Sequence, residues 1–401
     1  MINFICNRFN QSRDGMATDS TEFLLDELKN KREFSVTDIS NIVKDKRYYF
    51  IIHSLGYPTH ELKHNNSLPN KIVDLIHDGY DINIIFMTYH ETDRWDSLEL
   101  FEEYFSEIKI DTKRIYFYSG NSVIEDYKNK IKSKITVFPN KFIPYTISRQ
   151  MYLDGKMAEC KEDRMNVFQC YNRNMKEHRI ATLCSLYNNN ILPTVDWSNL
   201  YGSRLSDYKD TNGHWDFWNK TSEIKVIPDN KTSEYNDGLQ YLLDMGDYKS
   251  PEENFEFDQN GPQHNLSYQN NIYKNAYINI VTETQFEWPN TIHITEKTLQ
   301  PFYFYQIPII VGTYKHCAKV KELYDLDFFE DIIDISFDSE KNDSKRFMMI
   351  MDELNRISKI DKEEIRKWFN DKSFVKRLFK NRHKVELIQF DNYEHKFFDL
   401  L

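Results

Sequence analysis

Apolar residues in the first half of the chain form short runs that alternate with segments of helical spacing. Runs rich in β-branched and aromatic residues predict strands at 48–54, 82–90, 114–121 and 134–140. Apolar residues three and four positions apart predict helices at 70–79, 96–108 and 122–133. Strands joined by helices of this length form right-handed crossovers, so the pattern predicts a parallel sheet.

The second half repeats this alternation after a stretch of weak periodicity at 141–165. Strands are predicted at 165–174, 275–284 and 307–312, and helices at 176–190, after Thr295, at 345–357 and at 362–382. Residues 195–260 are assigned to loops and short helices. We therefore expect an α/β fold with two Rossmann-like domains, 1–155 and 156–401, the second ending in a helical tail. A single merged sheet is the structural alternative.

Three groups of polar residues in the second half stand at strand ends or helix starts. They are Asn172 and Arg173 with Arg179, Thr282 with Glu283, and Thr295 and Glu296 with Lys297. Carboxyl ends of parallel strands meet at one edge of a sheet, where ligands bind. Arginine and lysine supply donors for a diphosphate, and a carboxylate accepts hydrogen bonds from ribose hydroxyls. The groups together predict a nucleotide site.

The third group contains one residue that a simple helix start does not explain. Thr295 is a good N-cap, and Glu296 suits the positive end of the helix dipole. Lys297 opposes that dipole in the first turn, which makes sense if an anion such as a phosphate binds there. A capped surface helix with an incidental lysine is the alternative.

Composition limits the function classes. The 401-residue chain has a formal net charge of −11, which disfavours non-specific nucleic-acid binding. Its basic stretch at 372–384 is interpreted as a solvated helix face. Five cysteines without a CxxC pair indicate reduced thiols rather than disulfides or zinc. No apolar run is long enough to span a membrane and no signal peptide is evident, so we expect a cytoplasmic protein.

Several other motifs receive structural interpretations. HELKH at 60–64 matches HExxH, but its flanking breakers indicate a chance match on a loop. Asp325 and Asp327 form a DxD that is interpreted as a solvated turn, and Trp215 and Trp218 as packing residues. No metal site or cofactor is predicted. The absence of Walker A and GxGxxG motifs argues against kinase, ATPase and dehydrogenase functions.

The stretch ITEKTLQPFYFYQIPIIVG (294–312) resembles the donor-site motif of the α-1,3-fucosyltransferases. It resembles uncharacterised glycosyltransferase-like proteins of bacteriophages more closely. The shared elements are Ser119–Asn121, Asn172–Arg173, Val281–Thr284 and Ile294–Thr298, and the resemblance covers 115–121, 167–185 and 277–312. His293 stands where the fucosyltransferase motif has tyrosine.

This resemblance implies a GT-B fold whose C-terminal domain binds a nucleotide-sugar without a metal. By position, Glu296 would meet the ribose, Lys297 the diphosphate, and Arg179 or Arg173 a phosphate. Glu283 and Thr295 belong to the same predicted site. The implied reaction transfers a sugar to a hydroxyl of a glycan, a protein or a modified DNA base. A virus-encoded enzyme would act in the cytoplasm of the infected cell.

An inverting reaction also needs a general base from the N-terminal domain. Glu91, directly after a predicted strand, is the first candidate, and His90 is its rival. His53 and Glu61 are weaker candidates, and a retaining mechanism would need no such base. Two other functions stay open: a DNA-modifying glycosyltransferase acting on a hydroxylated base, and a non-catalytic nucleotide- or glycan-binding protein of the same fold. The donor sugar and the oligomeric state also stay open.

Overall fold

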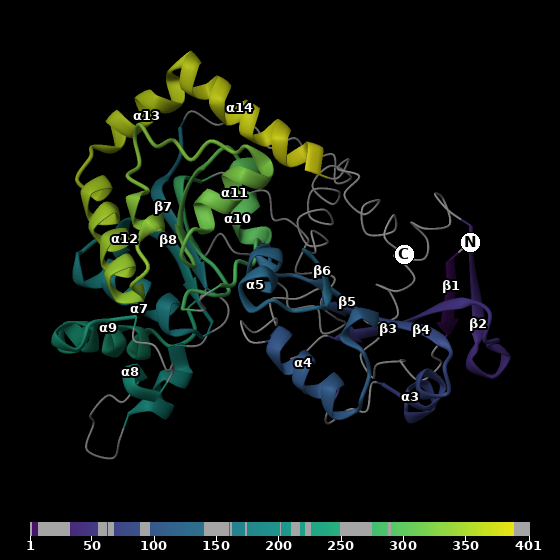
Figure 1. Ribbon diagram of the computed structural model, residues 1–401. Helices are drawn as coiled ribbons and strands as arrows, with labels where there is room; N and C mark the ends of the chain where they lie inside the picture. The colour runs from purple at the N-terminus through teal and green to yellow at the C-terminus, as the bar shows by residue number, and fades with distance from the viewer. Residues whose placement is uncertain are drawn as a thin grey trace. The chain divides into compact units, whose positions relative to one another are not determined.

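A computed structural model describes residues 2–6, 33–54, 62, 68–88, 97–139, 160, 163–172, 175–200, 202–209, 217–220, 226–248, 275–287 and 290–388 (Figure 1). The chain divides into two compact units. The first comprises Met1–Ile143, Trp288–His293 and Asn392–Leu401, and the second comprises Pro144–Glu287 and Ile294–Asp391. The predicted division lay at residue 155, whereas the chain also returns to the first unit just before Ile294.

The first unit is built on a parallel sheet. In its described residues the strand order is β2-β1-β3-β4-β5-β6, and every pair is parallel. The strands are β1 (Ile2–Cys6), β2 (Phe34–Asp38), β3 (Arg47–Ser54), β4 (Asp81–Thr88), β5 (Ile115–Ser119) and β6 (Thr136–Pro139). The four predicted strands are confirmed, and β1 and β2 extend the sheet beyond them.

Helices α3 (Asn70–His77), α4 (Ser97–Glu107) and α5 (Ile124–Ile131) pack on one face of this sheet. The alternation of strand side chains sets that face, because Phe50 and Ile52 point into this core and Tyr49 and Ile51 into the opposite one. Short 3₁₀ segments lie at η1 (Ile39–Asn41) and η2 (Thr112–Arg114). All three predicted helices of this half are confirmed.

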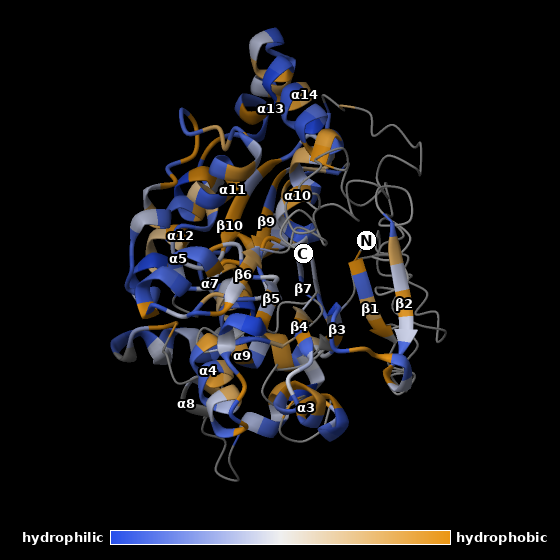
Figure 2. Cartoon of the chain, turned by 45° about the vertical axis from the view of Figure 1, so that its right-hand side comes forward, coloured by the Kyte–Doolittle hydropathy of each residue, from blue (hydrophilic) through white to orange (hydrophobic). Residues whose placement is uncertain are grey.

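The second unit holds a separate parallel sheet of order β10-β9-β7-β8 in its described residues. Its strands are β7 (Asn166–Asn172), β8 (Val195–Asn199), β9 (Ala276–Thr282) and β10 (Ile307–Val311). All residues of β9 and β10 are buried, and both strands are mainly apolar in Figure 2. The interpretation of 195–199 as loop is wrong, because VDWSN forms a strand that pairs with β7. Its polar residues break the kind of apolar run by which other strands were predicted.

Helices and turns connect these strands. α7 (Glu177–Asn188) follows β7, α10 (Glu296–Tyr303) precedes β10, and α11 (His316–Tyr324) follows it. The elements around β8 are η3 (Leu192–Thr194), η4 (Gly202–Tyr208), α8 (Phe217–Lys220), η5 (Asp229–Lys231) and α9 (Thr232–Met245). Trp218 is 4% exposed and donates to Asn236, so its interpretation as a packing residue is confirmed.

The helical tail consists of α12 (Asp343–Ser358), α13 (Lys362–Asn370) and α14 (Lys372–Leu387), after η8 (Ser336–Ser339). The prediction of one helix over 362–382 is wrong, because the chain breaks at Asp371. That residue has extended backbone angles, and its carboxylate accepts hydrogen bonds from the amides of Ser373 and Phe374, both at 2.9 Å. An N-cap of this strength ends one helix and begins the next.

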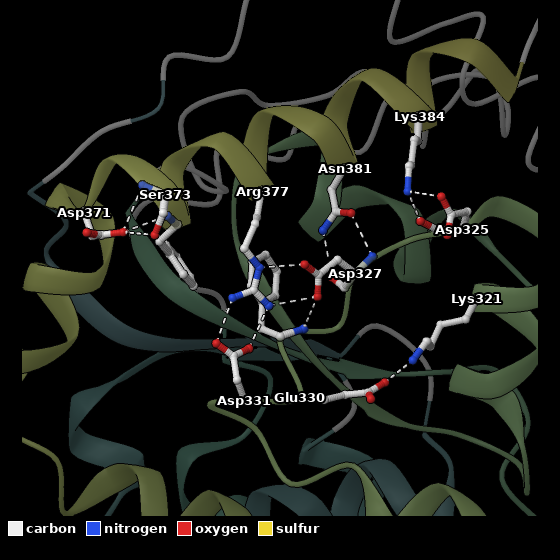
Figure 3. A network of polar contacts seen from close by, with 12 residues as sticks. Lys321, Asp325, Asp327, Glu330, Asp331, Asp371, Ser373, Arg377, Asn381 and Lys384 are labelled. Carbon is white, nitrogen blue, oxygen red and sulfur yellow. Dashed lines mark hydrogen bonds and ion pairs between the residues drawn. The ribbon is translucent and has the colours of Figure 1, made fainter.

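The basic stretch on α14 is only partly solvated (Figure 3). Arg377 binds Asp327 through Nε at 2.6 Å and Asp331 through Nη2 at 2.7 Å, and Lys384 pairs with Asp325. Asn381 exchanges two hydrogen bonds with the backbone of Asp327. The solvated-turn interpretation therefore holds for exposed Asp325, whereas Asp327 anchors α14.

The predicted class, an α/β protein with two Rossmann-like sheets and a helical tail, is confirmed. The single merged sheet is excluded, since β1 to β6 and β7 to β10 form different sheets. Within the described part of the chain, no helix is long and apolar enough to cross a membrane.

Candidate functional site

The carboxyl ends of the strands of the second sheet bring two of the predicted polar groups into contact. β7 ends at Asn172 and β9 at Thr282, and the Thr282 hydroxyl donates to Asn172 Oδ1 at 2.5 Å. Both side chains are buried. Segments more than a hundred residues apart in sequence thus share one edge of the sheet, as parallel pairing requires.

Glu283, the residue after β9, joins the third group to this edge. Its carboxylate is 1% exposed and accepts hydrogen bonds from Thr295 Oγ1 at 2.9 Å and from the amide of Thr284 at 3.1 Å. It also accepts from the hydroxyl of Thr298. A buried carboxylate needs such donors to offset the loss of hydration. Glu283 therefore fixes the first turn of α10 against the end of β9.

His316, at the start of α11, extends this network. Its Nε2 lies 2.9 Å from Thr298 Oγ1 and 4.0 Å from a Glu283 carboxylate oxygen. A threonine hydroxyl has one hydrogen, which Thr298 donates to Glu283, so His316 Nε2 must be the donor to Thr298. The order of donation is His316 to Thr298 to Glu283, and all three side chains are buried.

Arg179 and Lys176 bind the backbone of the same turn. Arg179 Nη2 donates to the carbonyls of Glu283 at 3.2 Å and Thr282 at 3.4 Å, and its side chain is 3% exposed. Lys176 Nζ donates to the carbonyl of Thr284 at 2.5 Å. Two cations at the start of α7 thus bind the turn that carries Glu283. The predicted contact of Arg179 with a phosphate stays a prediction.

His178 contributes a neutral donor to this turn. Its Nε2 lies 2.7 Å from the carbonyl of Glu283, which makes that nitrogen the protonated one, and its ring stacks on Phe286 with centroids 5.5 Å apart. Burial, and next the charge of Arg179, lower the pKa of His178 well below its ordinary value of 6.5. The imidazole is therefore uncharged at neutral pH.

The first turn of α10 carries the charged residues that reach solvent. Thr295 is the N-cap and accepts from the amide of Lys297 at 3.2 Å, as predicted. Lys297 Nζ lies 2.6 Å from a Glu296 carboxylate oxygen, and the two side chains are 31% and 27% exposed. The pair places one cation and one carboxylate in the first turn of α10, the turn that Glu283 binds from the buried side.

In the first unit, the predicted Ser-Gly-Asn element begins at Ser119, the last residue of β5, and has a structural role. Asn121 is 1% exposed, donates to the carbonyl of Asn290 at 3.0 Å and accepts from the amide of Ile292 at 3.0 Å. It thereby fixes the segment that the first unit takes from the second half of the chain. That segment ends at His293, immediately before Ile294.

Some predicted residues lie outside the described part of the chain. They are Arg173, His90, Glu91, Glu61, Trp215 and most of HELKH, and the side chain of His53 is likewise not described. Four residues of the site were not predicted: Lys176, His178, Thr298 and His316. Thr298 had a usable signal, because its spacing of three from Thr295 places both hydroxyls on one side of a helix. No sequence signal marked His316, because its contact with Thr298 depends on how α11 packs.

Comparisons with known proteins leave the family open. No family model matches the chain, and no curated protein matches it. Among solved structures, the alpha,alpha-trehalose 6-phosphate synthase from Burkholderia multivorans is similar, with 11% sequence identity and a TM-score of 0.37. The match covers 87% of this chain and 70% of that chain. A likeness at that TM-score indicates no function for this chain.

Ligation of a metal ion needs several His, Cys, Asp or Glu side chains close together. Among the residues that the structure describes, no three His, Cys, Asp or Glu side chains are grouped as they would be to hold a metal ion. Asp327 of the DxD lies against Arg377, and its carboxylate is used in that ion pair. The sequence-based expectation of a metal-free site stays a prediction.

Proposed function

We propose that the protein is a glycosyltransferase whose second unit binds a nucleotide-sugar donor at the carboxyl edge of the β10-β9-β7-β8 sheet. One observation carries this proposal: the buried carboxylate of Glu283 joins the Thr295–Thr298 turn to the end of β9. Polar groups that the sequence spreads over 110 residues meet there, as a ligand site at a parallel sheet edge requires.

Lys297 is the proposed diphosphate ligand. It lies in the first turn of α10, where the helix dipole and the backbone amides favour an anion. Its ion pair with Glu296 is partly exposed, so exchange of that carboxylate for a phosphate costs little. Glu296 is then available to accept hydrogen bonds from the ribose hydroxyls. Arg179 stabilises the turn after β9 by donating hydrogen bonds to the carbonyls of Thr282 and Glu283.

The proposed reaction breaks the bond between the sugar carbon and the diphosphate oxygen. Negative charge grows on the departing nucleotide, and a fixed cation such as Lys297 stabilises that charge in the transition state. In an inverting reaction the acceptor hydroxyl attacks the sugar carbon and passes its proton to a general base, for which Glu91 or His90 is proposed. The reaction is proposed to need no metal.

A screen of nucleotide-sugars tests this function. Thermal unfolding of the wild-type chain is followed in the presence of UDP-sugars, GDP-sugars and the other common donors, each at about 1 mM. A donor present at a hundred times its Kd stabilises the folded state by about 2.7 kcal/mol, which is a shift of a few degrees in Tm. No shift with any donor would exclude the donor site. A shift without transfer to any glycan, protein or DNA acceptor would favour a binding protein.

A further inference from the structure

The loop between β10 and α11 contains a buried hydroxyl, that of Thr313, which takes no part in the Glu283 network. Thr313 is 3% exposed, and among the described residues its Oγ1 has no hydrogen-bond partner. Buried side-chain hydroxyls are nearly always hydrogen-bonded, because an unpaired one costs free energy. Such a group becomes a candidate ligand contact where it also lies beside a proposed binding site, since no described residue supplies its partner.

The position of Thr313 points to what that partner is. Val311 pairs with Thr282, and its carbonyl accepts from the amide of Glu283 at 3.0 Å, so Thr313 lies just beyond the same carboxyl edge. The Thr313 carbonyl accepts from the amide of His316 at 3.1 Å. His316 in turn contacts the first turn of α10 through Thr298. Thr313 is therefore joined by a backbone hydrogen bond to His316, which contacts Thr298 of the proposed donor site.

This turn is held in place from several sides. Arg346, 1% exposed, donates from Nε to the carbonyl of Gly312 at 3.1 Å. A Cβ on Gly312 would lie 3.3 Å from the His316 ring and 3.2 Å from Ile310, so glycine permits the close approach of the loop to the ring. The backbone of this turn is thus held in place at Gly312 by Arg346 and by its close approach to His316.

The same loop carries positive charge. The ammonium groups of Lys315 and Lys341 lie 5.4 and 5.8 Å from the centre of the Tyr314 ring. Within the described residues neither lysine forms an ion pair, although the whole chain carries a net charge of −11. The two lysines beside the Tyr314 ring favour an anionic ligand near this loop.

We propose that Thr313 is a second contact residue of the donor site, whose hydroxyl donates to a phosphate oxygen of a nucleoside diphosphate held by Lys297. This inference rests on the proposed function and adds the β10–α11 loop as the second wall of the site. The positive charges of Lys315 and Lys341 attract the diphosphate to the β10–α11 loop. A hydroxyl donor to a charged phosphate contributes more than a neutral hydrogen bond.

The test compares Thr313→Val, which removes the hydroxyl and keeps the shape, with Thr313→Ser, which keeps the hydroxyl. Binding of UDP, GDP and inorganic pyrophosphate is measured by calorimetry. Ser198→Ala is the matched control, because Ser198 is also a buried hydroxyl without a partner among the described residues. It lies on β8, at the other edge of the sheet and about 14 Å away.

The valine variant is expected to bind the nucleotide about tenfold more weakly, while the serine and control variants stay within twofold of the wild type. Without ligand, the valine variant is expected to keep its Tm or gain a few degrees, because it removes an unpaired buried hydroxyl. Unchanged affinity in the valine variant, or a clear fall in its ligand-free Tm, would overturn the role of Thr313. Failure of the wild type to bind any of the three ligands would overturn the proposed function as well.

Discussion

At the scale of single residues, the candidate site is organised by a buried charge. Glu283 is 1% exposed, yet it has hydrogen-bond donors from two hydroxyls and one amide. His178 and Arg179 bind its backbone carbonyl from the other side. The residue therefore acts as a positioning group for the first turn of α10, which carries the partly exposed Lys297 and Glu296 that are proposed to bind the ligand.

His178 gives this arrangement a pH dependence. Its pKa is well below 6.5 in the folded protein because the ring is buried beside Arg179, whereas the unfolded chain titrates near 6.5. Below about pH 6.5 the unfolded state binds a proton that the folded state does not. Stability contributed by His178 is therefore complete above that pH and falls by about 1.4 kcal/mol per pH unit below it.

The matched variant is His178→Gln, which keeps a donor for the Glu283 carbonyl but does not titrate. Urea unfolding at pH 7.5 and pH 5.5 measures both proteins. The wild type is expected to lose about 1 kcal/mol more than the variant between these pH values. An equal loss in the two proteins would mean that the imidazole is not held neutral.

Residue identities in the site were only partly predictable. Glu283, Thr295, Glu296 and Lys297 stand directly at predicted strand and helix ends, so their grouping followed from topology. Which of them is buried did not follow, because burial depends on the packing of α10 over β9. Arg179 shows the same limit: its type suggests a phosphate ligand, but its observed partners are backbone carbonyls.

At the scale of elements, α10 is fixed at both ends. Glu283 accepts hydrogen bonds from its first turn. Arg382 of α14 contacts Tyr303, the last residue of α10, and Tyr305 just beyond it. The Arg382 guanidinium is 6% exposed, lies 4.5 Å from the centre of the Tyr303 ring and donates to the Tyr305 hydroxyl at 3.0 Å. The tail helix thus contributes to the position of the helix that carries Lys297.

The attachment of α14 is predicted to depend on Arg377. Arg377→Ala leaves the carboxylates of Asp327 and Asp331 without their shared cation, and is expected to lower the free energy of unfolding by about 1–2 kcal/mol. Lys376→Ala removes a charge from the exposed face of the same helix and is expected to change stability by less than about 0.5 kcal/mol. Equal effects in urea unfolding would show that the ion pairs do not hold the helix.

The same pairs add a second pH dependence. Hydrogen bonds from Arg377 lower the pKa of Asp331. Burial raises the pKa of Asp327, but the hydrogen bonds from Arg377 and from the amide of Phe329, together with the charge of Arg377, lower it overall. Carboxylates with a lowered pKa stabilise the fold above their unfolded pKa near 3.9 and lose that stabilisation as the pH falls further. The contribution of α14 is therefore constant at neutral pH.

Most elements could be predicted because their apolar spacing is regular. The strands that were missed lack this signal: Asn3 interrupts the apolar run of β1, β2 has polar residues at Ser35, Thr37 and Asp38, and β8 contains Asp196, Ser198 and Asn199 among its five residues. The break between α13 and α14 was missed because the periodic pattern runs through it, whereas the capping carboxylate of Asp371 decides the boundary.

At the scale of the whole molecule, the two units have separate sheets, and the chain passes into the first unit again at 288–293. Sequence patterns indicated two domains, but the return was not predictable, because it depends on Asn121 binding the backbone at 290 and 292. The motif that is proposed to bind the donor begins at Ile294, where the chain re-enters the second unit.

The proposed general base belongs to the first domain. Glu91→Gln is expected to keep nucleotide-sugar binding and to slow transfer about a hundredfold or more, the usual scale for loss of a general base. His90→Gln is the neighbouring control, expected to have the smaller effect. Single-turnover transfer and calorimetry separate the two quantities. Full activity in the Glu91 variant would assign the base to His90 or favour a retaining reaction.

The most direct test of the account is nucleotide binding by Lys297→Ala. Calorimetry with the best donor from the screen compares it with the wild type and with Lys367→Ala, which removes an exposed lysine of α13 paired with Glu364. We predict that Lys297→Ala binds at least tenfold more weakly with an unchanged Tm in the absence of ligand, and that Lys367→Ala binds as the wild type does. Equal affinity in all three proteins would contradict the placement of the diphosphate at the first turn of α10.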